Sequence, residues 1–264
     1  MEAAHTIRAA VARVGAIRED AKSSPSLRAA LVVVKAFQAK RFAGTYADLL
    51  RSAEYGAAAS FFLEDLYSDK DYSERDAQFS RIAGALQRLF PQQVVTTAVA
   101  LAELHLLTEE LDWQMATQWE RHAAAEGSSG NGDVARYIAS WRGVGRTDDR
   151  MRQLDMVLSV GKDLDRLTRT PGLRLILRMM RGPARAGGMG SLQHFLESGF
   201  DTFANMSGDG RSAAEFLSTI RARESSWIQL LSIGDATECE VRLRACLSDV
   251  RLVAEDAGHS SAAR

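Results

Sequence analysis

The chain has 264 residues, of which 46% are hydrophobic and 25% are charged, and its formal net charge is −1. This hydrophobic content is ample for a buried core, so the composition excludes disorder of the whole chain. A net charge this small also excludes a global field that would attract nucleic acid or an anionic membrane. Any binding of that kind must therefore come from a local patch.

The N-terminal segment MEAAHTIRAAVARVGAIRED lacks a continuous apolar stretch and carries acidic residues, which is untypical of a secretory signal. The most apolar run, residues 94–107, is too short to span a bilayer and contains glutamate and histidine. We therefore expect a cytoplasmic protein without a transmembrane segment.

Helix signals follow one another along the chain, whereas strand signals are almost absent. Ser24 and Pro25 predict the start of a helix whose apolar positions recur at spacings of three and four. Capping boxes, in which a carboxylate follows a polar N-cap residue by three positions, predict further helix starts at Ser73 with Asp76, Ser212 with Glu215, and Asp235 with Glu238. The pattern predicts an all-α, bundle-like fold of about ten to twelve helices.

One predicted helix stands out by its length. Residues 92–125 form a continuous helical pattern whose first half is apolar on nearly every side, so we expect a central helix surrounded by others. The glycine-rich stretch EGSSGNGD at 126–133 follows it and marks a possible subdomain break. We favour a single helical domain over residues 1–264, with that stretch as a surface loop.

Several motifs resemble those of a known family. They are FFLEDLYSDKDYSERDAQFSRI at 61–82, LAELHLLTEELD at 101–112, LRMMRGPARAGGMGSLQHFLESGF at 177–200 and FLSTIRARE at 216–224. Together they make the chain similar to a bacterial family of all-helical proteins described as a domain of unknown function. The resemblance covers most of the chain. It implies a helical fold and a bacterial cytosolic setting, and it implies no activity.

The arrangement of histidines and carboxylates raises a cofactor hypothesis. His105 and Glu109 are four residues apart on the long predicted helix and so share one face. With Glu64 on an earlier helix and His194 on a later one, they are candidate ligands for iron, as in helical di-iron proteins, or for haem. The chain lacks the paired Glu-x-x-His motifs of di-iron bundles. The alternative is that His105 hydrogen-bonds a carboxylate while Glu109 is solvated or paired with arginine.

A second hypothesis rests on charge. Residues 166–196 contain six arginines and no acidic residue. Arg174, Arg178 and Arg181 fall on one helical face, and Arg185 follows them. An apolar stripe of Leu173, Ile176, Leu177 and Met180 adjoins that face. A basic amphipathic helix binds an acidic protein surface or anionic lipid, or it packs inward with its arginines paired to acids elsewhere.

The sequence lacks the usual catalytic signatures. It contains no Gly-x-Ser-x-Gly, P-loop or His-Glu-x-x-His motif, and no strand that could carry a dinucleotide fingerprint. Its two cysteines lie seven residues apart in one predicted helix, which is too far for a disulfide bond between them. We assign them no chemistry.

We therefore expect a non-catalytic binding, regulatory or scaffolding protein that contacts a protein or an anionic surface through Arg174, Arg178, Arg181 and Arg185. Its partner is expected to be another protein or a second copy of the chain, without specific binding of nucleic acid. No cofactor is predicted under this hypothesis. The alternative is an iron-binding or haem-binding helical protein, or an oxidoreductase, that uses Glu64, His105, Glu109 and His194.

Overall fold

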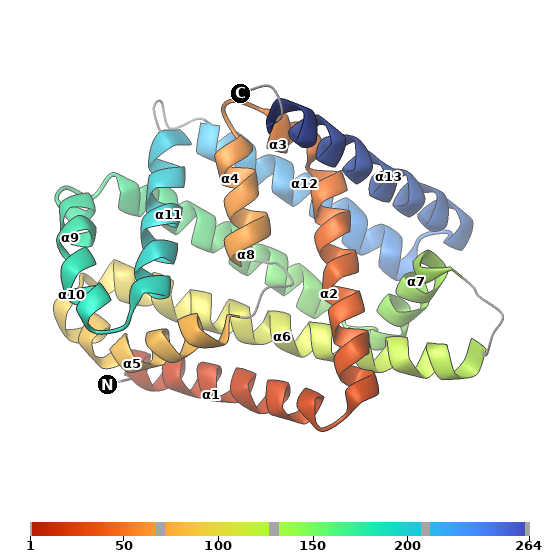
Figure 1. The fold of residues 1–264 in the computed structure, drawn as a ribbon, viewed down its shortest axis with the longest axis horizontal. Coiled ribbons are helices and arrows are strands. Elements are labelled where there is room, and N and C mark those ends of the chain that lie inside the picture. The colour runs from red at the N-terminus through yellow and green to blue at the C-terminus, as the bar shows by residue number, and fades with distance from the viewer. Residues whose placement is uncertain (1, 67–71, 127–131, 207–211, 262–264) are drawn as a thin grey trace. The chain divides into compact units, whose positions relative to one another are not determined.

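The computed structural model describes residues 2–66, 72–126, 132–206 and 212–261. Within these ranges the regular structure is entirely helical, which confirms the all-α fold (Figure 1). The chain divides into two compact units, each assembled from three separate segments. Unit 1 comprises Met1–Asp20, Lys70–Leu111 and Asp148–Ala222, and unit 2 comprises Ala21–Asp69, Asp112–Thr147 and Arg223–Arg264.

Unit 1 contains most of α1 and α8, all of α5, α9, α10 and α11, and the first parts of α6 and α12. The bounds of these helices are α1 Glu2–Lys22, α5 Ser73–Leu89, α6 Gln92–Glu126, α8 Thr147–Thr168, α9 Leu173–Met179, α10 Arg181–Ala186, α11 Gly190–Met206 and α12 Ser212–Ile233. One core cluster joins α1, α5 and α6 through small and aliphatic side chains, with Ile7 fully buried. A second cluster joins α8, α9 and α11 through Leu167, Leu173 and Phe200.

Unit 2 contains the remaining helices together with the later parts of α6 and α12. The bounds are α2 Pro25–Thr45, α3 Ala47–Arg51, α4 Gly56–Phe61, the π-helical segment η1 Phe62–Leu66, α7 Asp133–Val144 and α13 Ala236–Ser261. Helix α13 packs on α2 and α7. The rings of Phe37 on α2 and Tyr137 on α7 stack with centroids 4.2 Å apart.

The helix starts show where local signals decide the structure. The Ser24 side chain accepts a hydrogen bond from the Leu27 amide, as the sequence predicts. Asp235 likewise accepts one from the Glu238 amide at 2.9 Å. Helix α5 begins at Ser73, as predicted, but the capping role of Ser73 and Asp76 was wrong, because Tyr72 is the N-cap residue and no side chain caps the N-terminus. Asp76 instead takes part in a buried polar network.

The long helix predicted over 92–125 is confirmed as α6. Between residues 94 and 107 only Thr96 and Glu103 are exposed, so this stretch is covered on nearly all sides. The stretch 126–133 lies largely outside the described residues, and both of its flanks, 112–126 and 132–147, belong to unit 2. The expectation of a single domain stays a prediction.

Candidate functional site

The arginine-rich stretch predicted as a contact surface forms two short helices of unit 1, α9 and α10. Both lie beside α11 (Figure 1). Leu173 at the start of α9 is buried in the cluster with Phe200 of α11, and Leu177 packs against that cluster. Gln193 of α11 donates a hydrogen bond of 2.7 Å to the Leu177 carbonyl, which satisfies an acceptor at the end of α9. Helix α11 therefore fixes the orientation of α9.

This orientation leaves three large apolar side chains of α9 in contact with solvent. Leu175 is 62% exposed, Ile176 44% and Met179 68%. Met179 lies three residues after Ile176 and four after Leu175, so the three side chains form one outward face. The apolar stripe predicted from the sequence included Ile176 but neither Leu175 nor Met179. Their exposure could have been predicted, because Leu175 and Met179 lie on the far side of a helical wheel from Leu173, which is buried.

The arginines flank this apolar face and differ in how they are paired. Arg174 forms an ion pair of 2.8 Å with Asp201, and Arg181 donates two hydrogen bonds to Glu197. The bond from Arg181 is the leading cause that holds the pKa of Glu197 below its ordinary value. Two of the four predicted contact residues therefore already bind carboxylates of α11.

The other two arginines remain available. Arg178 and Arg185 are exposed, and among the described residues neither forms an ion pair, although the charge of Arg178 helps to hold the pKa of Glu197 below its ordinary value. We call Arg174, Arg178, Arg181 and Arg185, together with the exposed Leu175, Ile176 and Met179, the α9–α10 surface. It offers two unpaired cations beside an apolar face.

The four candidate cofactor ligands are distributed over both units. Glu64 lies in η1 of unit 2, whereas His105, Glu109 and His194 belong to unit 1. His194 is exposed on α11. His105 and Glu109 share one face of α6, as the spacing predicts, and both approach Arg18 of α1. In the described ranges, no set of three histidine, cysteine, aspartate or glutamate side chains has an arrangement that could hold a metal ion.

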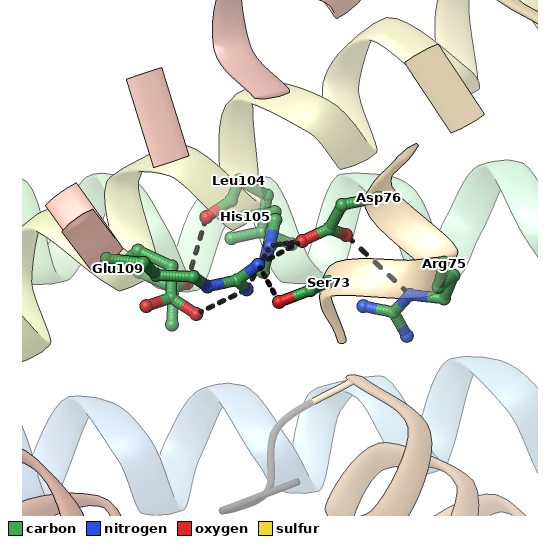
Figure 2. A network of polar contacts seen from close by, with 8 residues as sticks. Ser73, Arg75, Asp76, Leu104, His105 and Glu109 are labelled. Atoms are coloured by element: carbon green, nitrogen blue, oxygen red, sulfur yellow. Dashed lines mark hydrogen bonds and ion pairs between the residues drawn. The ribbon is translucent and has the colours of Figure 1, made fainter. Parts of the chain in front are cut away.

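A buried polar network surrounds His105 (Figure 2). His105 Nε2 lies 2.9 Å from Asp76 Oδ2, and Arg18 donates to the same carboxylate oxygen at 2.9 Å. A second nitrogen of Arg18 lies 3.1 Å from Glu109 Oε1. Since an ionised carboxylate only accepts hydrogen bonds, the proton of this contact belongs to Nε2 of His105. The alternative interpretation of His105 as a hydrogen-bonding residue therefore matches the geometry.

The charges of this network balance one another. Burial raises the pKa of Asp76, but the hydrogen bond from His105 and the electrostatic interactions with His105, Arg18 and Arg75 outweigh it and leave the pKa below its ordinary value. Burial likewise lowers the pKa of Arg18, while Glu109 and Asp76 raise it overall. Each carboxylate faces a cation, so we interpret the network as structural.

A second buried network, in unit 2, had no signal in the sequence. Arg41 is 2% exposed and donates to both carboxylate oxygens of Glu224, at 3.1 and 2.8 Å. The hydroxyl of Tyr46 donates to the same carboxylate at 2.8 Å. Burial and the neighbouring Glu224 raise the pKa of Tyr46, so the phenol stays protonated. The guanidinium also lies over the Phe42 ring, 4.1 Å from its centroid.

Both cysteines are buried, and neither forms a disulfide bond, as expected from their spacing. Burial raises the pKa of Cys239, which keeps the thiol protonated and unreactive. Cys246 donates a hydrogen bond to the Arg41 carbonyl at 3.2 Å. The two thiols therefore act as small core residues.

In the described ranges, no helix combines the length and the apolarity that crossing a bilayer requires. Comparison with curated proteins and with solved structures finds no match. The model of one family matches residues 17–238, which is most of the chain and includes the long α6 and the α9–α10 surface. The chain therefore belongs to the family described as Domain of unknown function (DUF8198).

Proposed function

We propose that this chain is a non-catalytic helical binding protein that contacts a protein or an anionic surface through its α9–α10 surface. The observation that carries the proposal is the exposure of Leu175, Ile176 and Met179 beside Arg178 and Arg185, which form no ion pair with another described residue. Large apolar side chains gathered on one exposed face are typical of interaction sites. We further propose that the protein works in the bacterial cytoplasm as a regulatory or scaffolding module.

The chemistry of the surface supports binding. An arginine without a carboxylate partner recognises carboxylate or phosphate groups through two parallel hydrogen bonds. The neighbouring Arg181 shows that an arginine at this place binds a carboxylate, since its Nε donates to both oxygens of Glu197. A partner would supply the corresponding anions to Arg178 and Arg185.

The proposal is tested by capture from a lysate of the source cells, with retained proteins and lipids quantified by mass spectrometry. Reversing two charges, in the double variant Arg178→Glu and Arg185→Glu, places like charges against an anionic partner. We expect its retention to fall by at least about tenfold. Both side chains are exposed, so circular dichroism should show an unchanged helical fold.

The matched control is Arg28→Glu, which reverses an exposed arginine of α2, outside the α9–α10 surface. We expect it to capture the same partner as the unmodified chain. Equal retention by all three proteins would contradict the proposed function, because the α9–α10 arginines would then contribute nothing to binding.

A further inference from the structure

The shape of the α9–α10 surface indicates which kind of partner fits it. Leu175 and Met179 are each more than half exposed on a short helix, so the apolar part of the surface is open to solvent. The shallow depression beside it is lined mainly by charged side chains: Arg174, Leu177, Arg178, Arg181, Glu197, Phe200 and Asp201. Grooves that receive an amphipathic helix of a partner protein are lined by apolar side chains, whereas five of the seven residues that line this depression are charged.

An anionic lipid bilayer matches both halves of the surface. Its phosphates complement arginines, and the boundary between headgroups and acyl chains accepts apolar side chains that project from a surface. No acidic residue occurs between 166 and 196, so the charge near α9 does not oppose an anionic membrane. The two acids that approach from α11, Asp201 and Glu197, are each neutralised by an arginine.

We propose that the α9–α10 surface docks on an anionic phospholipid bilayer. Leu175, Ile176 and Met179 enter the boundary between headgroups and acyl chains, while Arg178 and Arg185 bind lipid phosphates. This inference rests on the proposed function, since it names the partner of the same surface. The chain is then a peripheral membrane protein that associates reversibly, because three apolar side chains and a few charges give a modest membrane affinity.

The charge requirement is tested by sedimentation with vesicles made of equal parts phosphatidylglycerol and phosphatidylcholine. We expect the full chain to bind these vesicles at low salt and not to bind vesicles of phosphatidylcholine alone. Each arginine near an anionic surface contributes about fivefold in affinity, so Arg178→Gln with Arg185→Gln should weaken binding about 25-fold. The control Arg28→Gln should bind like the unmodified chain.

The need for apolar side chains distinguishes binding to a bilayer from binding to phosphate groups alone. Leu175→Ala with Met179→Ala removes side-chain carbons from the acyl boundary and should weaken vesicle binding by at least about tenfold. Val241→Ala on α13 is the matched control, because Val241 is 62% exposed and lies outside the surface. If the arginine variant loses vesicle binding and the Leu175 and Met179 variant keeps it, binding depends on charge alone. The proposed insertion of apolar side chains into the bilayer is then wrong.

Failure of this inference differs from failure of the proposed function. If the unmodified chain ignores anionic vesicles but still captures a protein through Arg178 and Arg185, the bilayer is the wrong partner and the binding function stands. If neither vesicle binding nor arginine-dependent capture is observed, both are wrong. Vesicle binding that needs both the arginines and the apolar residues supports the bilayer.

Discussion

At the scale of single residues, the buried pair of Arg41 and Glu224 is expected to be the most sensitive polar contact of unit 2. Glu224→Gln removes the negative charge but keeps the size of the side chain, so the Arg41 guanidinium stays buried without its counter-charge. We expect the free energy of unfolding to fall by about 3–5 kcal/mol. Urea denaturation followed by circular dichroism measures this change.

The adjacent exposed pair supplies a control of the same chemistry. Arg223 binds Asp48 through two short contacts, and the Asp48 side chain is 57% exposed. The contact holds the pKa of Asp48 below its ordinary value. Asp48→Asn should cost less than about 1 kcal/mol, because water replaces the lost interaction. Equal costs for the two variants would show that burial does not set the strength of the Arg41 contact.

The network around Asp76 predicts a dependence of stability on pH. The pKa of Asp76 is lowered in the folded chain, so its stabilising contribution is complete above its ordinary pKa of 3.8 and is lost as the pH falls through the lower folded value. Asp76→Asn should therefore destabilise the chain near neutral pH by more than it does in acid. Urea denaturation of the unmodified chain and of the variant at several pH values measures the difference in their free energies of unfolding. A difference that does not shrink in acid would contradict the stabilising role of ionised Asp76.

Sequence patterns identified the specific partner of a side chain only where that partner is close in the chain. Ser24 and Asp235 bind amides three residues away, so their capping roles could be predicted. Asp76 also carried a capping signal, yet its carboxylate binds Arg18, 58 residues earlier. Arg41 and Glu224 are 183 residues apart. Such pairs depend on the tertiary arrangement, which local periodicity does not contain.

At the scale of helices, the contact between α2 and α13 makes a sharp prediction. Gly44 of α2 lies so close to α13 that a Cβ atom there would be 1.9 Å from the backbone oxygen of Cys246. Gly44→Ala should therefore force the two helices apart and cost about 1–3 kcal/mol or more. Differential scanning calorimetry should show a lower melting temperature.

Gly15 of α1 is the matched control for this substitution. Nothing lies within 4 Å of the position that a Cβ atom at Gly15 would occupy. Gly15→Ala should therefore raise stability by about 0.5–1 kcal/mol, since alanine loses less backbone freedom than glycine when a helix forms. A stabilising effect at both glycines would show that α2 and α13 do not pack as closely as described.

The helices themselves were largely predictable. Residues 92–125 were predicted as one helix, and α6 spans Gln92–Glu126, because its apolar positions are frequent and no glycine or proline interrupts it. The amphipathic face of α9 was predicted only in part. The pattern grouped Ile176 with the buried Leu173, whereas the packing of α11 on α9 turns Ile176 outward. Which side of a short helix faces its neighbour is a tertiary property.

At the scale of the whole molecule, the sequence predicted the fold class and the family but carried no signature of an activity. The cofactor alternative stays a prediction with its own test. We expect native mass spectrometry of protein purified without chelators to give the mass of the 28.9 kDa chain or of its multiples. A stoichiometric iron or haem adduct that His105→Ala removes would contradict the non-cofactor function and favour the alternative.

The central claim is that the chain acts by binding through its α9–α10 surface. Photo-crosslinking in living cells tests it most directly, with a benzophenone amino acid placed either at Met179 or at Val241, which are similarly exposed. We predict lipid or protein adducts at position 179 that disappear with Arg178→Glu and Arg185→Glu, and none at position 241. Adducts that form equally at both positions, or that persist after the charge reversal, would contradict the claim.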